Sequence, residues 1–227
     1  MATRVRLFSL LTLGFAVVLF AVPGYGNVLP PGPSSVAPDV FANNGGAGYG
    51  AILANTGVQA FNFAGDTGSV QQIVTTDPVT GFLDFLTEVN VTGGELEHVT
   101  VANFSGAGFG SVSYPDVGYD TIACLTGIGC AAPGPNVIAP TTVNTLNNVA
   151  ISFNFAAGVM PGQESELLVV KTDARTFGAG TIGLIDGGGA TLGGYAPSPE
   201  PSQVGLLLGG LFAAGLFLTR RFQTRQS

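Results

Sequence analysis

Several residue types that often build catalytic or binding sites are scarce in this chain of 227 residues: tryptophan is absent and histidine occurs once, as His98. A Ser-His-Asp triad could use only His98, and no Gly-x-Ser-x-Gly motif accompanies it. A zinc site needs three or four nitrogen or sulfur ligands, and one histidine with two cysteines reaches that number only if the fold brings them together. Without tryptophan, a sugar would have to stack on tyrosine or phenylalanine. We therefore expect His98 to be an ordinary strand residue, and we expect no metal or cofactor.

Basic residues are also scarce, and most of them lie near the two ends of the sequence. Only two remain in the interior, against fourteen acidic residues, so the interior carries 2 − 14 = −12 formal charges. Such a surface repels the phosphates of nucleic acids, which excludes nucleic acid as a partner. The charge serves solubility, and an alternative is that it attracts divalent cations or basic partners. The five basic residues near the ends are Arg4, Arg6, Arg220, Arg221 and Arg225.

The spacing of the carboxylates gives no sign of a hydrolase. Asp84 and Glu88 would share a strand face about 13 Å apart at roughly 3.3 Å per residue, and Glu95 and Glu97 follow. Glycoside hydrolysis uses two carboxylates about 5–10 Å apart across a cleft. Calcium loops of the Asp-x-Asp-x-Asp type and phosphate loops ending in Lys-Ser/Thr are absent from the sequence. The sequence predicts that the protein is not an enzyme, with an exported carboxylate-based hydrolase as an alternative.

The first 26 residues have the layout of a secretory signal peptide. Arg4 and Arg6 form a basic segment, and residues 7–22 form an apolar segment interrupted only by Ser, Thr and Gly. Gly24 and Gly26 offer small residues at the cleavage site, so we expect cleavage after Gly26. The alternative is an uncleaved N-terminal anchor, and either form predicts export.

Residues 204–218 are predicted to cross a membrane as a helix. This run contains no charged or polar side chain. With Ser202, Gln203 and Thr219 it reaches roughly 27 Å as a helix, close to the ~30 Å of a hydrocarbon core. Arg220 and Arg221 follow and would hold the next residues on the cytoplasmic side. The alternative is a buried helix of a soluble core, but such a helix should show a polar stripe.

Pro199-Glu200-Pro201, the short apolar run and the arginines together resemble the PEP-CTERM sorting signal. The resemblance covers about thirty residues near the C-terminus. It implies that an exosortase in the membrane recognises Pro199, Glu200 and Pro201 and cleaves nearby. It further implies release or transfer of the protein to the surface of bacteria that make exopolysaccharide. The alternative is an ordinary Pro/Ser linker before an anchor, since two prolines keep a segment extended in either case.

A passage upstream adds to this resemblance. It begins with Pro161-Gly162-Gln163-Glu164-Ser165, continues with a strand ending in Lys171-Thr172-Asp173-Ala174 and an Asp186-Gly187 turn, and closes with Tyr195-Ala196-Pro197. A similar order recurs just before the sorting signal in many PEP-CTERM proteins. Here Gln163 precedes the glutamate, and Asp173 stands where asparagine is usual. The passage implies a β-sandwich and no particular activity.

Short segments with period-two alternation predict a mainly β, antiparallel β-sandwich. We expect a hairpin formed by residues 83–91 and 96–104 and a second hairpin around Asp186-Gly187. The predicted organisation is a signal peptide (1–26), a Gly/Pro-rich lead-in (27–50), the sandwich (51–196) and the sorting signal (197–227). Further strands are expected at residues 58–63, 70–75, 151–155, 167–172, 181–185 and 190–192.

Cys124 and Cys130 are the two cysteines of the chain. Two cysteines in an exported protein most often pair, so a structural disulfide is predicted, although so short a loop stabilises by only roughly 2 kcal/mol. A free thiol pair or a metal site is the alternative.

The sequence thus predicts an exported protein anchored in the inner membrane, facing the periplasm, and moved to the surface after processing. Its expected role is structural or interactive, in an exopolysaccharide or biofilm matrix. The alternative is a β-sandwich module that binds a glycan or a cation.

Overall fold

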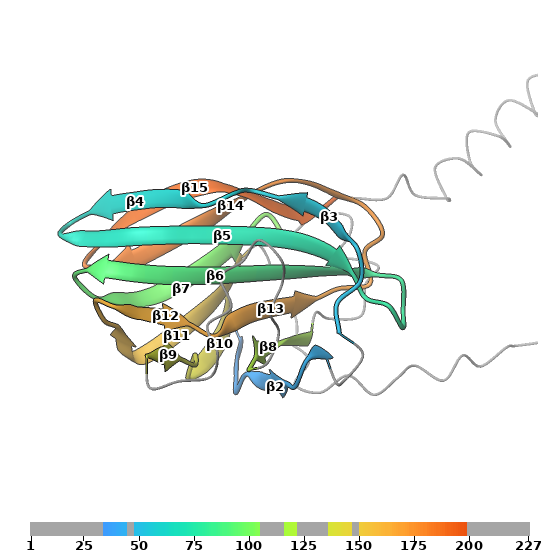
Figure 1. The fold of residues 1–227 in the computed structure, drawn as a ribbon, viewed down its shortest axis with the longest axis horizontal. Helices are drawn as coiled ribbons and strands as arrows, with labels where there is room; N and C mark the ends of the chain where they lie inside the picture. Colours follow the sequence, from blue (N-terminus) through green and yellow to red (C-terminus); the bar gives the residue numbers. More distant parts are fainter. Residues whose placement is uncertain (1–33, 45–47, 105–115, 122–135, 147–149, 199–227) are drawn as a thin grey trace, which may run out of the picture.

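The computed structural model describes residues 34–44, 48–104, 116–121, 136–146 and 150–198. These residues are mainly β, and their strands lie in two sheets that face each other (Figure 1). None of the described residues forms a helix of a length and apolarity that would cross a bilayer. The apolar run 204–218 lies outside the described residues.

Six described strands form an antiparallel sheet, named sheet B, in the order β1-β10-β11-β7-β14-β15. The longest pairing joins β14 to β15 from Phe177↔Pro197 to Asp186↔Gly188. Because β7 lies between β11 and β14, the sheet is held together by pairing between distant parts of the chain. The bounds are β1 (Ser34–Val36), β7 (Leu96–Ala102), β10 (Thr142–Leu146), β11 (Ala150–Val159), β14 (Phe177–Asp186) and β15 (Gly188–Pro197).

The other nine described strands form sheet A, which is built around the long pair β5 and β6. Strands β13 and β12 pair with β6, β8 and then β2 continue beyond β13, and β3 and β4 pair with β5. The pairs β2·β8 and β9·β12 are parallel, so sheet A is mixed. The bounds are β2 (Asp39–Phe41), β3 (Ile52–Asn55), β4 (Gln59–Phe63), β5 (Asp66–Thr76), β6 (Leu83–Gly93), β8 (Asp116–Asp120), β9 (Val137–Ile138), β12 (Gln163–Ser165) and β13 (Leu167–Lys171).

The main core lies between the two sheets. Sheet A contributes Phe85 and Val89 to it, and sheet B contributes Ile151 and Phe153, all at most 1% exposed. The rings of Phe85 and Phe104 form a T-shaped pair with their centroids 5.2 Å apart, a geometry that aromatic pairs favour. This burial explains the alternation seen in the sequence, because every second residue of β6 and β11 faces the opposite sheet.

A second, smaller apolar cluster covers the outer face of sheet A. It contains Ile73, Leu86 and Val169 from the sheet, packed against Phe41 and Tyr49. The last two belong to a segment named here the strap (residues 39–44 and 48–50), which includes β2. The strap therefore gives the outer face of sheet A its own apolar cover.

Most of the expected strands form where the sequence predicted them, and the β14–β15 hairpin turns at Asp186-Gly187 as expected. The predicted hairpin of residues 83–91 and 96–104 is wrong. β6 pairs within sheet A and β7 within sheet B, so the Gly93-Gly94 turn crosses between the sheets. Both strands bury one face in the same core, and a pattern of alternation cannot tell such an arch from a hairpin.

Strands β1 and β2 lie within residues that the sequence analysis gave to the lead-in. β1 pairs with β10, and β2 pairs with β8, so both belong to the sheets. Each has three residues, which is too short for alternation to reveal. The described sheets therefore begin at Ser34, ahead of the expected boundary at residue 51.

Candidate functional site

Seven polar residues gather where the strap meets sheet A, and we name them the buried polar cluster. β6, β8 and β13 supply four of them, the strap supplies two, and one follows β5. Asp84 is 1% exposed and Asp120 is 2% exposed, which is unusual for carboxylates. The members are Asn44, Tyr49, Asp77, Asp84, Asp116, Asp120 and Lys171.

Lys171 stands between two aspartates in one row across sheet A. It is directly opposite Asp84 on β6 and directly opposite Asp116 on β8. Directly opposite residues of antiparallel strands have side chains on the same face with Cβ atoms about 4.5–5.5 Å apart. The neighbouring Val170 points into the main core, so this row lies on the outer face of the sheet.

Asp120 fixes the strap to the sheet. Its Oδ1 accepts a hydrogen bond from the backbone N–H of Asn43 at 3.0 Å, and its Oδ2 accepts from the N–H of Asn44 at 2.7 Å. The hydroxyl of Tyr49 also donates to Oδ2, at 3.0 Å. Asn43 and Asn44 have left-handed backbone angles, φ 50° and 52°, which asparagine tolerates better than most residues. A single carboxylate thus holds both sides of the strap.

The side-chain amide of Asn44 lies between a lysine and a carboxylate. Lys171 Nζ donates a hydrogen bond to Asn44 Oδ1. Asn44 Nδ2 donates to the carbonyl oxygen of Gly48 at 2.6 Å and to Asp77 Oδ2 at 3.3 Å. Lys171 Nζ also lies 4.4 Å from the ring centroid of Phe41. Two strap residues, Asn44 and Phe41, therefore contact this lysine nitrogen.

Burial and neighbouring charges change the proton affinity of the cluster in different directions. Burial raises the pKa of Asp84 to about 7; the charges of Asp77 and Asp116 act the same way, and Lys171 opposes them. Burial also acts to raise the pKa of Asp77, but hydrogen bonds from Thr80, Val79 and Asn44, together with Lys171, hold it below its ordinary value. The cluster therefore contains one carboxyl that titrates near neutral pH beside one that stays ionised.

Burial, together with the charge of Asp120 and their hydrogen bond, raises the pKa of Tyr49 far above its ordinary value. Its hydroxyl therefore remains a donor to Asp120. The cluster therefore places the amine of Lys171 next to the amide carbonyl of Asn44, beside carboxyl groups that can carry protons. Among the described residues, no group of three or more His, Cys, Asp or Glu is placed to hold a metal ion.

A shallow hollow of about 170 Å³ lies elsewhere on sheet A. Glu88, Asn90 and Glu164 line it, and Asn90 Nδ2 donates to Glu164 Oε1 at 2.6 Å. Burial, with a smaller contribution from the Glu164 charge, raises the pKa of Glu88 to about 8. The structure therefore brings Glu88 close to Glu164, a partner on β12 that the sequence did not indicate. Only the register between β6 and β12, which the sequence does not give, could have revealed that these two glutamates are close.

The sequence-predicted carboxylates do not form one group. Asp84 belongs to the buried polar cluster and Glu88 to the hollow, both on β6. Glu97 lies on β7 in the other sheet, and the backbone N–H of Glu95 donates to Asp66 Oδ1 at 3.0 Å where the chain crosses between the sheets. No two of these four residues therefore stand opposite each other in one sheet.

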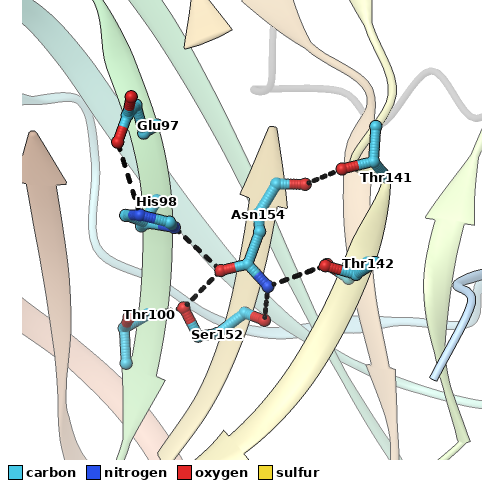
Figure 2. A network of polar contacts seen from close by, with 7 residues as sticks. All are labelled: Glu97, His98, Thr100, Thr141, Thr142, Ser152 and Asn154. Carbon is cyan, nitrogen blue, oxygen red and sulfur yellow. Dashed lines mark hydrogen bonds and ion pairs between the residues drawn. The ribbon is translucent and has the colours of Figure 1, made fainter. Parts of the chain in front are cut away.

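His98 takes part in a polar network on sheet B (Figure 2). Its Nδ1 lies 2.8 Å from Asn154 Oδ1, and its Nε2 lies 3.6 Å from Glu97 Oε2. Asn154 Nδ2 donates to Thr142 Oγ1 at 3.1 Å, and Ser152 Oγ donates to Asn154 Oδ1 at 3.3 Å. His98 lies on β7, Asn154 on β11 and Thr142 on β10, so the network joins these three strands.

The remaining sequence predictions fall outside the described residues. These are the disulfide of Cys124 and Cys130, the motif Pro199-Glu200-Pro201 and the arginines Arg220 and Arg221. Comparisons with known protein families, with curated proteins and with solved structures found no match.

Proposed function

We propose that this protein is exported, anchored in the inner membrane and cleaved by an exosortase. Its β domain then serves a structural or interaction role in an exopolysaccharide or biofilm matrix. The observation that carries the proposal is the order of Pro199-Glu200-Pro201, the apolar run 204–218 and Arg220-Arg221. Its partners would be the exosortase, the membrane and the matrix polysaccharide.

The position of the last described strand supports this proposal. β15 ends at Pro197, and the N–H of Ser198 donates to the carbonyl oxygen of Thr176 at 3.0 Å. The motif begins at the next residue, Pro199. A cut at the motif would therefore release the whole described domain without breaking any of its strands.

A non-catalytic role agrees with the burial and the charge of the described residues. Sheet A buries apolar residues on both of its faces, one against sheet B and one against the strap. Only two basic residues, Lys171 and Arg175, belong to this acidic domain. An acidic, well-covered β domain suits a hydrated matrix, because its net charge keeps it soluble.

Intact-mass measurement of the protein from the surface and membrane fractions of its native host tests this function. A mature species that begins near Asn27 and ends near the 199–201 motif is expected. Glu200→Ala should abolish the C-terminal cut, while Glu97→Gln, which changes an exposed acid on β7, should leave it intact. A surface species that retains residues 204–227 would overturn the proposal.

A further inference from the structure

We propose that Lys171 and Asn44 react to form an isopeptide bond that covalently joins the strap to β13. The bond would link Lys171 Nζ to Asn44 Cγ and release ammonia. This inference rests on the buried polar cluster alone, so it stands or falls independently of the sorting signal.

The two reacting groups are already in contact. Lys171 Nζ donates a hydrogen bond to Asn44 Oδ1, which places the amine beside the carbonyl carbon that it would attack. Asn44 is 5% exposed, and Asp120 holds its backbone N–H in place. Fixing two reactants in such proximity raises their effective concentration by many orders of magnitude. Burial also keeps out water, which would otherwise compete with the amine.

Asp84 is placed to carry the proton that the reaction must move. It lies directly opposite Lys171 in the β6–β13 register and interacts with it electrostatically. Its Oδ2 is buried and has no hydrogen-bond partner among the described residues. Burying a polar atom without a partner costs stability, and a proton carrier accounts for its presence. A carboxyl with a pKa near neutral both takes and returns a proton efficiently.

The reaction balances without a co-reactant. The Lys171 ammonium gives a proton to the Asp84 carboxylate, and the neutral Nζ attacks Cγ of Asn44. The Nζ–Cγ bond forms, Asp84 returns the proton to Nδ2, and the Cγ–Nδ2 bond breaks. Ammonia leaves and takes up the second proton of Nζ. One ammonium and one primary amide thus become one secondary amide and one ammonium ion, and Asp84 ends in its starting state.

The neighbouring groups favour this outcome. Asn44 Nδ2, the leaving nitrogen, donates to Asp77 Oδ2 and to the Gly48 carbonyl oxygen, which fixes the orientation of the amide. Phe41 covers Lys171 Nζ with its ring. The product would fasten the strap over the second apolar cluster, at a point 127 positions away in the chain.

The sequence provides a direct test, because Lys171 and Arg175 are the only lysine or arginine residues between Arg6 and Arg220. Trypsin should cut the purified, denatured full chain after Arg175 but not after a cross-linked Lys171. The tetrapeptide of residues 172–175 is then not released. In the Lys171→Arg variant no cross-link can form, and the tetrapeptide should appear in full amount. Its full release from the folded wild-type protein, once denatured, would overturn the proposal.

A second digest identifies the bond. Chymotrypsin should yield a branched peptide in which residues 42–49 are joined to the segment containing Lys171, with the mass of one ammonia missing. Asn44 precedes Gly45, and a succinimide formed there would also lose ammonia. Such a succinimide gives no branch and leaves Lys171 open to trypsin, so it counts against the proposal. A branch from Lys171 to Asp84 or Asp116 would also overturn it.

Two matched variants test the part assigned to Asp84. Asp84→Asn keeps the shape of the side chain and removes the proton carrier, so cross-linking should slow at least a hundredfold. Asp116→Asn makes the same change on the other side of Lys171 and should still cross-link. Circular dichroism shows whether each variant is folded. If either variant unfolds, the trypsin digest of the wild-type protein still tests whether the cross-link forms. Equal cross-linking in the two folded variants would remove Asp84 from the mechanism.

Discussion

Lys171 and Asn44 are 127 positions apart in the chain, yet the nitrogen of the lysine donates a hydrogen bond to the amide oxygen of the asparagine. This contact joins the strap to the centre of sheet A. Asp120, the pairing of β2 with β8, and the packing of Phe41 and Tyr49 also hold the strap.

The Lys171→Arg variant should be less stable than the wild type by about 5 kcal/mol. A covalent bond across a loop of this length restricts the unfolded chain much as a disulfide does, which accounts for that magnitude. Urea unfolding followed by circular dichroism measures the difference. Arg175→Lys, which alters the other basic residue of the domain, should cost less than about 1 kcal/mol.

Replacing Asp120 with asparagine should destabilise the domain by about 2–4 kcal/mol. The carboxylate accepts hydrogen bonds from two backbone N–H groups and from the Tyr49 hydroxyl, and bonds to charged groups are stronger than neutral ones. Urea unfolding gives the loss, and limited proteolysis shows whether the strap opens first. Glu97→Gln on the exposed part of sheet B should stay within about 0.5 kcal/mol of wild type. A similar loss in both variants would contradict the anchoring role.

The stability of the domain should fall as the pH rises from about 4 to about 7. Asp84 has a folded pKa of about 7 against an ordinary 3.8, so in this window the folded state keeps a proton that the unfolded state has released. At 1.36 kcal/mol per pKa unit, the fall is at most about 4 kcal/mol. In Asp84→Asn the side chain is neutral throughout, so the urea midpoint should depend less on pH. Equal slopes for the two proteins would show that Asp84 does not titrate in this way.

Glu164→Gln should lower the pKa of Glu88 without restoring its ordinary value. Burial is the larger cause of the raised pKa of about 8, and the charge of Glu164 is the smaller. Titration of the labelled Glu88 carboxyl by NMR should therefore show a partial decrease. Glu97→Gln changes a carboxyl on the other sheet and should leave this titration as it is. A rise in the pKa of Glu88 on loss of Glu164 would contradict the electrostatic account of the hollow.

Gly118→Ala should detach β2 from sheet A. A Cβ at this position would lie 2.1 Å from the backbone oxygen of Asp39, so the strand must move. We expect a loss of about 1–3 kcal/mol, as for other overpacking changes, and faster hydrogen exchange in residues 39–44. At Gly183 on β14, an added Cβ would meet Thr100 Cβ at an ordinary 3.6 Å. Gly183→Ala should therefore leave the exchange of the strap unchanged.

The β-rich class and the long strands could be predicted from the sequence. In β6 and β11 every second residue enters the main core, and the alternation records this directly. The Asp186-Gly187 turn likewise carried a local signal, because glycine tolerates the φ of +53° found at Gly187. Local patterns therefore sufficed to place the long strands and this turn.

The candidate site could not be predicted in the same way. Asn44, Asp84 and Lys171 lie in three separate parts of the chain, and no spacing along the sequence relates them. Their meeting depends on the register of β13 between β6 and β8 and on the packing of the strap against the outer face of sheet A. The sequence analysis placed the strap in a lead-in, because its strand of three residues is too short to show a period.

The sequence by itself determined the charge of the domain, its β character and the order of motif, apolar run and arginines near its end. These depend on composition or on neighbouring residues, whose effects are local. Only the tertiary structure decided that β6 and β7 belong to different sheets, and that a lysine, an amide and a buried carboxyl meet beneath the strap. Such relationships arise from pairing between distant strands, and residues far apart in the chain leave no periodic trace of the contacts that they make.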